Sequence, residues 1–244
     1  MSRSCYTPQM SVSARLALAA AGAVSGMTWA VRGRSSAVFG PSVWRGRRDR
    51  KSIALTFDDG PTPGTLRILD ILREHGVPAT FFQIGSQVAL QPDIARAVQE
   101  EGHEIGNHSQ THPNLALKPP ATIAVEFERA QETIVNVTGQ APAFLRAPYG
   151  VRWFGFREAQ QRLNLTGAMW TLIGRDWKLP AEAVSKRILR RAQEGDIICL
   201  HDGRGTLKDP DISSTVEAVR RIVPALLEKG YHFETVSQLI CPMK

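Results

Sequence analysis

The segment LTFDDGP (residues 55–61) places two aspartates, Asp58 and Asp59, directly after an apolar run. The run SIALTF (52–57) has the length and the β-branched and aromatic content of a buried strand, and the Gly-Pro pair after the aspartates is typical of a turn. Adjacent carboxylates repel each other, so we expect a metal ion, a cation or solvent beside them. The segment therefore predicts both the first strand of a fold and the first residues of a site.

Outward from this strand, short apolar runs alternate with longer segments of helical spacing. Strands that alternate with helices predict a parallel sheet, and at this length a closed or nearly closed (β/α) barrel with about seven parallel strands accommodates it. The expected strands are 52–57, 79–84, 103–106, 142–146, 166–171, 196–200 and 231–236. The expected helices are 64–75, 86–101, 121–137, 156–163, 180–193 and 211–229.

The positive charge of the chain is concentrated at its N-terminus. The 244 residues have a net charge of +7, and 43% of them are hydrophobic, enough for the core of one large domain. Residues 1–51 hold nine of the 30 Lys and Arg but one of the 23 Asp and Glu, a balance of +8, which leaves 21 basic and 22 acidic residues for the remainder. A main domain close to neutral argues against a nucleic-acid-binding face, so no nucleic-acid partner is expected.

An uncharged stretch, LALAAAGAVSGMTWAV (16–31), lies within this N-terminal part. It resembles the apolar region of a signal peptide or a short membrane anchor, although it is shorter than the ~20 residues that span a bilayer. We therefore divide the chain into a hydrophobic and basic leader, 1–40, and one domain, 41–244. The leader predicts export or association with a membrane, with a cytoplasmic location as the alternative. The three cysteines show neither a disulfide framework nor a zinc-thiolate spacing.

Polar side chains follow several of the expected strands, at the end where each strand stops. In barrels of alternating strands and helices, the carboxyl ends of the strands carry the active site. The sequence therefore predicts that these residues gather around one site. They are Asp58, Asp59, His108, His112, Arg146, Asp176, Trp177 and His201.

The segment NHSQTH (107–112) places His108 and His112 four residues apart. On one helical turn the two imidazoles would share a face and grip one divalent ion. Taken alone, the pair is more typical of two surface histidines. Together with Asp59 it offers three protein ligands and leaves room for water, as in catalytic zinc sites, with cobalt or nickel as alternatives to zinc. Asp58 is then free to act as a general base on the metal-bound water.

Three further residues have a structural and a catalytic interpretation. Arg146, in RAPYG (146–150), can hold a catalytic carboxylate or form an ordinary salt bridge. His201, in CLHDG (199–203), is a candidate general acid opposite a metal, although a lone histidine after a buried strand is more often structural. Trp177 can wall a sugar-binding groove or simply pack against its neighbours. Asp202 is expected to cap or turn its loop.

Five motifs together resemble the polysaccharide deacetylase family, the carbohydrate esterases with a NodB homology domain. TFDDGP (56–61), HSQTH (108–112), RAPYG (146–150), RDW (175–177) and LHDG (200–203) occur in the family's order, and the resemblance spans about residues 51–240. The resemblance implies a distorted (β/α) barrel. It also implies hydrolysis of N-acetyl groups on an acetylated glycan such as chitin or peptidoglycan, with acetate released and metal-bound water as the nucleophile.

The resemblance further implies roles for matching residues. Asp58 is the base, Asp59, His108 and His112 bind the metal, Arg146 steadies Asp58, His201 protonates the leaving amine, and the backbone N–H of Tyr149 helps to hold the oxyanion. Two positions depart from the family. Ile173 stands where an additional acid is often found, which leaves Asp176 to supply charge to His201. Cys199 stands where the family often has Leu in the acetyl-methyl pocket.

Two other functions compete with N-deacetylation. The same scaffold serves O-acetyl esterases, which differ in the acetylated substrate. A non-catalytic carbohydrate-binding barrel is the third reading, and the general base and acid candidates count against it because binding needs neither.

Overall fold

The apolar run that leads into the two aspartates forms β2 (Ser52–Asp58), and all seven of its residues are buried. The computed structural model describes residues 11–241. A strand buried on both faces is typical of a parallel sheet covered by helices. β2 pairs in parallel with β3 (Thr80–Gln83), β8 (Ile197–His201) and, near its start, β9 (His232–Phe233).

The strands form one curled parallel sheet. Its order is β1-β6-β5-β4-β3-β2-β8-β7, with β9 beside β2. The strands not yet given bounds are β1 (Ser42–Val43), β4 (Glu104–Asn107), β5 (Phe144–Leu145), β6 (Thr166–Ala168) and β7 (Leu172–Ile173). Within residues 11–241 the two end strands, β1 and β7, are not paired with each other, so the barrel is open on one side. The prediction of a distorted (β/α) barrel is confirmed, and its strands number nine in this part of the chain.

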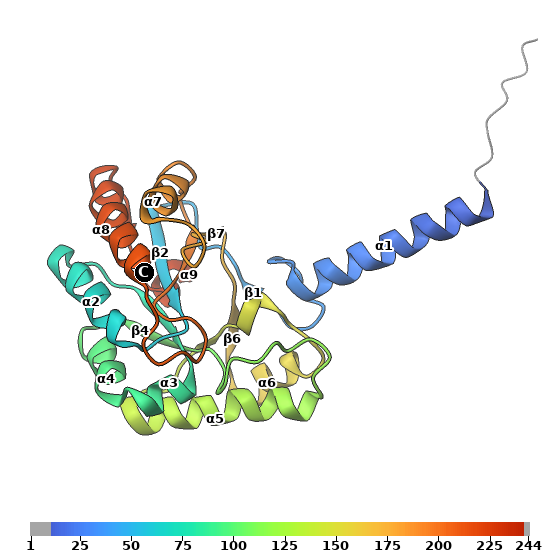
Figure 1. Cartoon of the computed structure of the whole chain (residues 1–244), viewed down its shortest axis with the longest axis horizontal. Helices are drawn as coiled ribbons and strands as arrows, with labels where there is room; N and C mark the ends of the chain where they lie inside the picture. Colours follow the sequence, from blue (N-terminus) through green and yellow to red (C-terminus); the bar gives the residue numbers. More distant parts are fainter. Residues whose placement is uncertain (1–10, 242–244) are drawn as a thin grey trace, which may run out of the picture.

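Helices surround the sheet (Figure 1). They are α2 (Pro63–His75), α3 (Gly85–Leu90), α4 (Pro92–Glu100), α5 (Pro120–Thr138), α6 (Phe156–Leu163), α7 (Ala181–Leu189) and α8 (Ser213–Glu228). The short helix α9 (Val236–Ile240) packs Val236 and Leu239 against Ala54 and Ile197, near the starts of β2 and β8. It therefore fills the amino end of the barrel and leaves the carboxyl end for the site.

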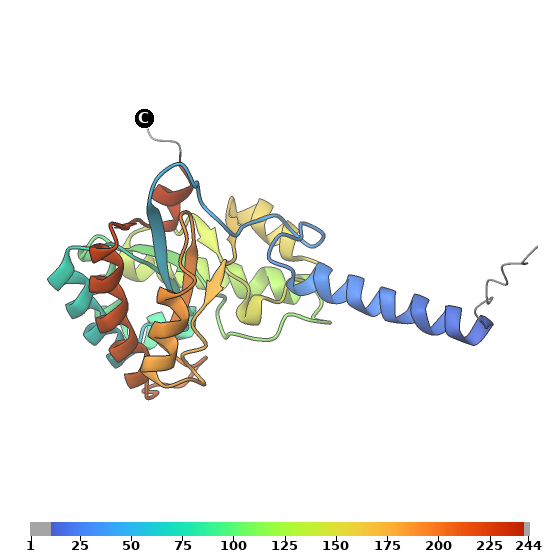
Figure 2. The same cartoon turned by 90° about the horizontal axis from the view of Figure 1, so that it is seen from above.

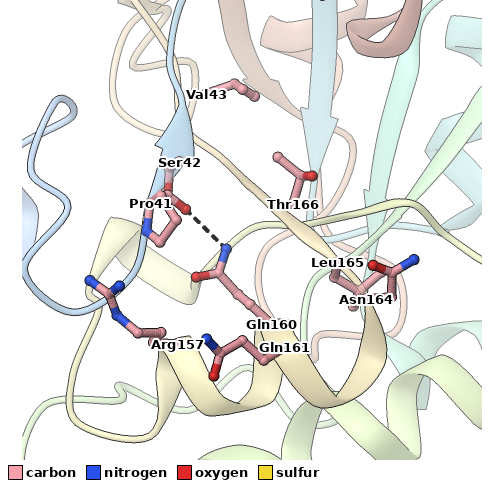
Figure 3. A pocket seen from close by; sticks show the side chains of 9 residues that line it. All are labelled: Pro41, Ser42, Val43, Arg157, Gln160, Gln161, Asn164, Leu165 and Thr166. Carbon is pink, nitrogen blue, oxygen red and sulfur yellow. Dashed lines mark hydrogen bonds between the residues drawn. The ribbon is translucent and has the colours of Figure 1, made fainter.

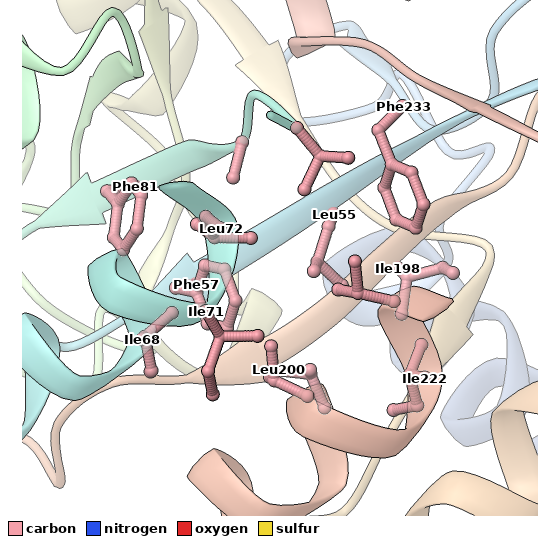
Figure 4. Packing of buried hydrophobic residues seen from close by; sticks show 14 of the residues in the cluster. Leu55, Phe57, Ile68, Ile71, Leu72, Phe81, Ile198, Leu200, Ile222 and Phe233 are labelled. Carbon is pink, nitrogen blue, oxygen red and sulfur yellow. The ribbon is translucent and has the colours of Figure 1, made fainter. Parts of the chain in front are cut away.

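Successive residues of β2 face two different surroundings. Ile53, Leu55 and Phe57 belong to the core between the sheet and its helices, where Figure 4 shows Leu55 and Phe57 among side chains of α2, α8 and neighbouring strands. Because side chains alternate along a strand, Thr56 and Asp58 face the opposite way, into the barrel. Because Ile53, Leu55 and Phe57 are buried against the helices, the carboxylate of Asp58 points into the barrel at its carboxyl end.

Some elements differ from the prediction for identifiable reasons. The helix expected over 86–101 is two helices, α3 and α4, because Pro92 has no N–H to continue the first one. The strands β1 and β7 and the helix α9 were not predicted. Two-residue strands and a five-residue helix are too short to leave a periodic pattern in the sequence.

The apolar part of the leader lies in a long helix, α1 (Val12–Arg32), which projects away from the barrel (Figures 1 and 2). Leu18, Val24 and Trp29 on this helix are each more than half exposed. Within residues 11–241, none of the helices combines the length and the apolar character needed to cross a membrane. Residues 1–10, including Cys5, lie outside the described residues.

The segment 33–40, which we assigned to the leader, is attached to the domain through Arg152. This guanidinium is 1% exposed and donates hydrogen bonds to the carbonyl oxygens of Gly33 and Ser36, the latter at 2.6 Å. Phe39 adds an aromatic contact, with its ring centroid 5.2 Å from that of Trp153. The boundary between residues 40 and 41 stays a prediction, and these contacts make it testable.

Candidate active site

The expected site residues meet around one cavity of about 520 Å³ at the carboxyl ends of the strands. All of them line it except Arg146 and Asp176, which lie buried behind the lining. The lining residues from the prediction are Asp58, Asp59, His108, His112, Tyr149, Trp177, Cys199 and His201.

Asp58, the last residue of β2, is held by Arg146. The Nη1 atom of Arg146 donates to Oδ1 of Asp58 at 2.6 Å and to the hydroxyl of Thr56 at 2.8 Å. Its Nη2 donates to the carbonyl oxygen of Met169 at 3.1 Å, and its guanidinium lies 3.9 Å from the ring centroid of Phe82. Arg146 is fully buried, so the ion pair is shielded from solvent and Asp58 is fixed in one orientation.

His108 has a defined tautomer. Its Nδ1 lies 2.8 Å from the carbonyl oxygen of Arg146, which can only accept, so the proton of the neutral ring is on Nδ1. Its Nε2 is therefore a bare acceptor, and it lies 3.4 Å from Oδ1 of Asp59. The Nε2 of His112 lies 3.0 Å from the same oxygen. Oδ1 of Asp59 is buried without a hydrogen-bond partner among the described residues.

These three donor atoms fit one divalent ion. Two acceptors that face each other repel unless a cation lies between them. Ligands about 2.0–2.1 Å from a tetrahedral zinc ion lie roughly 3.3–3.4 Å apart, close to the separations from Asp59 to the two histidines. The other oxygen of Asp59 accepts a hydrogen bond from the N–H of Gly205 at 2.9 Å, which fixes the carboxylate.

The helical turn expected for His108 and His112 is wrong. Residues 108–112 form an irregular loop after β4, in which Ser109 and His112 have positive φ of 67° and 57°. Asp59 and Tyr149 at the same site also have positive φ, 78° and 57°. Non-glycine residues seldom adopt this conformation, and such strain concentrates at functional sites. The two imidazoles converge because of this loop and not because of a helical face.

His201, the last residue of β8, is oriented by Asp176. Oδ1 of Asp176 lies 3.0 Å from Nδ1 of His201, and Oδ2 accepts a hydrogen bond from the hydroxyl of Thr215 at 2.7 Å. Burial lowers the pKa of His201, but the hydrogen bond and the charge of Asp176 outweigh it and raise this pKa to about 9. The imidazole is therefore protonated at neutral pH, and its Nε2 is the nitrogen left for the cavity.

Cys199 and two aromatic residues complete the expected set. The Cys199 thiol is fully buried and donates to Oδ2 of Asp58 at 3.5 Å. Burial and the neighbouring Asp58 charge raise the pKa of this thiol well above its usual value, so it stays protonated. Trp177 packs edge-on against His201 at 4.8 Å between ring centroids, and Tyr149 against His112 at 4.7 Å. Both aromatic side chains are about half exposed and form walls of the cavity.

The cavity also has lining residues that the sequence argument missed. Arg32, at the end of α1, and Trp170, between β6 and β7, both line it. No motif marks them, because only the tertiary fold brings these segments to the site. Asp202 was expected to cap a loop, but it is fully buried, accepts a hydrogen bond from the Thr65 hydroxyl at 2.7 Å and has a pKa that burial raises to about 7.

A second cavity, of about 440 Å³, lies at the amino end of β6 beside α6 (Figure 3). Gln160 donates to the carbonyl oxygen of Pro41 there at 2.9 Å, and Arg157 and Asn164 add further polar groups. Its lining contains neither a carboxylate nor a histidine. This cavity therefore offers neither an imidazole nor a carboxylate to bind a metal ion or to move a proton.

The polysaccharide deacetylase family model matches residues 45–168. This chain belongs to the polysaccharide deacetylase family. A chitooligosaccharide deacetylase from Bradyrhizobium sp. (strain ANU 289) is 37% identical over 198 residues, which cover 78% of this chain and 90% of that protein. The predictions of the family and of a hydrolase acting on carbon–nitrogen bonds other than peptide bonds are confirmed.

Solved structures of the polysaccharide deacetylase family include active and inactive proteins. The Bc1960 peptidoglycan N-acetylglucosamine deacetylase superposes with a TM-score of 0.76 at 31% identity, over 81% of this chain and 91% of that chain. BA3943 from Bacillus anthracis, described as a pseudoenzyme of the family, superposes with a TM-score of 0.74 at 28% identity, over 81% of this chain and 68% of that chain. Because a pseudoenzyme shares the fold, the fold alone does not show that this chain is active.

Proposed function

We propose that the protein hydrolyses N-acetyl groups of amino-sugar residues in a chitin-like or peptidoglycan-like glycan and releases acetate, with one divalent metal ion at Asp59, His108 and His112. The observation that carries this proposal is the convergence of one carboxylate oxygen and two imidazole nitrogens on one point, directly beside a carboxylate held by a buried arginine. Zinc suits this mixture of imidazole and carboxylate, and cobalt or nickel are alternatives. When bound, such an ion polarises a carbonyl oxygen and lowers the pKa of water.

Asp58 is the proposed general base. Its carboxylate lines the cavity next to the metal ligand Asp59, so it can take the proton of the attacking water. Arg146 prevents its rotation and stabilises the charged form. The two adjacent aspartates thus have different tasks: Asp59 binds the ion, and Asp58 moves the proton.

His201 is the proposed general acid. Its Nε2 faces the cavity, and Asp176 keeps the ring protonated, so it can donate a proton to the leaving amine. The backbone N–H of Tyr149 is proposed to stabilise the oxyanion, and Trp177 and Cys199 to line the space for the sugar and the acetyl group. The site thus pairs a protonated imidazole that can give a proton with a carboxylate that can take one, as amide hydrolysis requires.

Two other functions could use the same site: O-acetyl ester hydrolysis and carbohydrate binding without catalysis. An O-acetyl esterase would use the same base and metal, but its alcohol leaving group depends less on protonation by His201. A non-catalytic barrel would bind a carbohydrate without hydrolysing it. BA3943, the pseudoenzyme with the same fold, shows that the family includes inactive proteins.

A panel of acetate-release assays tests the proposal. Metal-stripped protein, with and without added zinc, is given N-acetylated chitooligosaccharides, peptidoglycan and O-acetylated xylan. We expect zinc-dependent acetate release from an N-acetylated glycan. Faster release from O-acetylated xylan would favour the esterase, and no release from any substrate would favour the non-catalytic barrel.

We also propose that α1 associates with a membrane surface. Its exposed apolar residues are followed by Arg32 and Arg34, and basic residues are attracted to anionic lipids. Sedimentation with anionic vesicles tests this proposal, with a chain that begins at residue 30 as the control. Equal sedimentation of the two chains would contradict it.

A further inference from the structure

A second group of metal-ligating residues lies in the cavity beside the first. It consists of Asp58, Cys199 and His201, and one ligand atom from each lies within 4.8 Å of the other two. The strand register produces this group: His201 is the partner of Asp58, and Cys199 is the partner of Thr56, on the paired strands β8 and β2. Because side chains two residues apart share a face of a strand, all three point into the barrel.

Each of the three residues has one ligand atom that is not already engaged by a strong partner. Arg146 occupies Oδ1 of Asp58, which leaves Oδ2, and the only contact of Oδ2 among the described hydrogen bonds is the weak thiol donor of Cys199 at 3.5 Å. Asp176 occupies Nδ1 of His201, which leaves Nε2. The free atoms are thus a carboxylate oxygen, a sulfur and an imidazole nitrogen.

We propose that Asp58, Cys199 and His201 form a second, weaker cation site that binds a thiol-preferring divalent ion such as Zn²⁺ and that inhibits the enzyme when it is filled. Thiolate and imidazole ligands select Zn²⁺ and similar ions, whereas Mg²⁺ prefers oxygen ligands and water. Binding replaces the Sγ–H bond of Cys199 by a bond from sulfur to the ion and the Nε2–H bond of the His201 imidazolium by a bond from Nε2 to the ion, and both protons leave to solvent.

Three features make this site weaker than the first. The Arg146 guanidinium lies against Asp58 and repels a second cation, as does an ion held by the adjacent Asp59. The buried thiol and the His201 imidazolium must also lose their protons, which the raised pKa of each group opposes. The first site has no thiol to deprotonate, because its ligands are one carboxylate and two imidazoles. The second site therefore fills only when the ion is in excess.

The inhibitory effect rests on the proposed function, because the ion would occupy both the proposed base and the proposed acid. Binding itself does not depend on that function. The two parts are therefore tested by different measurements on the full chain.

Cobalt titration tests the binding. Metal-stripped protein is titrated with Co²⁺, and bound metal is counted while the absorption band of a cobalt–thiolate bond is recorded. We expect two ions per chain, with the thiolate band appearing with the second ion. The Cys199→Ala and Cys199→Val variants should bind one ion and lack the band, whereas a Cys5→Ser/Cys241→Ser double variant should keep both. His108→Ala/His112→Ala should lose the first ion and keep the band.

Different results would contradict the second cation site and its inhibitory effect. A single ion in the wild-type chain, or a thiolate band that persists in both Cys199 variants, would overturn the site.

An assay of acetate release tests the inhibition. Excess Zn²⁺ should inhibit acetate release, while Mg²⁺ at the same concentration should not. The half-inhibitory Zn²⁺ concentration should rise at least about 10-fold in Cys199→Ala, because even loss of an outer-shell partner weakens metal sites by that factor. An unchanged half-inhibitory concentration in Cys199→Ala would contradict the inhibition. A wild-type chain that releases no acetate would contradict the proposed function, but it would not affect the cobalt result.

Discussion

Asp176 holds His201 by two contacts: its Oδ1 lies 3.0 Å from Nδ1 of the imidazole, and its Oδ2 accepts the backbone N–H of the same residue at 2.9 Å. Asp176 is itself fixed by the hydroxyl of Thr215. The resemblance described above led us to expect a further acid at the position of Ile173, which in this chain is apolar. The carboxylate that supplies charge to the proposed general acid is therefore Asp176.

Replacing Asp176 should change the pH profile of turnover. The negative charge of Asp176 favours imidazolium and raises the pKa of His201 to about 9, so the acid is active below that pH and is lost above it. Asp176→Asn should lower kcat and move the alkaline limb to lower pH. A bound divalent ion repels imidazolium, so the limb of the metal-loaded wild type should lie below pH 9.

The measurement is a pair of kcat–pH profiles at saturating metal, with Asp209→Asn, an exposed aspartate, as the control. His201→Ala should remove the limb and retain the metal. An alkaline limb that stays in place in Asp176→Asn would show that Asp176 does not tune this histidine.

Replacing Arg146 should reduce both stability and turnover. Its fully buried guanidinium joins Asp58, Thr56 and the carbonyl of Met169, so Arg146→Met leaves a buried carboxylate unpaired. Breaking a buried pair costs about 3–5 kcal/mol. Arg146→Lys keeps the charge but lacks the forked donors, and we expect an intermediate loss.

Denaturant unfolding and acetate release measure the two effects, with Arg129→Met, on the exposed side of α5, as the matched control. Wild-type stability together with wild-type turnover in Arg146→Met would contradict the assigned contact.

Removing residues 33–40 should destabilise the domain. A chain that begins at residue 41 lacks the carbonyl groups that accept hydrogen bonds from Arg152, and it lacks Phe39. An unpaired buried donor costs about 1–3 kcal/mol, and the lost burial of a Phe side chain roughly 1.5–3 kcal/mol. At about 2–4 °C per kcal/mol for a domain of this size, Tm should fall by about 5 °C or more relative to a chain that begins at residue 30.

The matched test is Arg152→Met in the shorter chain, which removes the unpaired charge and should recover part of the loss. Equal Tm values for the two chain lengths would place the boundary of the domain at residue 41, as the sequence alone predicted.

Much of this architecture could be predicted because its signals are local. The buried strand ending in Asp58 and Asp59 is visible as an apolar run, and the rule that parallel strands end on one side brings His108, Arg146 and His201 to the same place. The sequence also predicted Asp176 as the partner of His201, because the residue at position 173 is apolar, and the two side chains are in contact. These inferences need only the order of strands, which the alternation of patterns supplies.

The remaining features depend on tertiary contacts that no local pattern encodes. A loop with positive φ at Ser109 and His112 turns the two imidazoles toward Asp59, whereas the four-residue spacing predicted a helical turn because it fits both. Arg32 and Trp170 reach the cavity through the docking of residues 33–40 and the turn after β6. The closeness of Cys199 to Asp58 appears only once the register of β2 and β8 is known.

The central claim is that the two adjacent aspartates divide the work, with Asp59 binding the metal and Asp58 accepting the proton. The most direct test measures bound zinc and acetate release in the matched variants Asp58→Asn and Asp59→Asn. Asp58→Asn should keep one ion per chain and lose about 10²–10⁴-fold in turnover, the usual effect of removing a general base. Asp59→Asn should lose the ion and activity together. An Asp58→Asn protein that lacks zinc, or that retains turnover, would contradict this division.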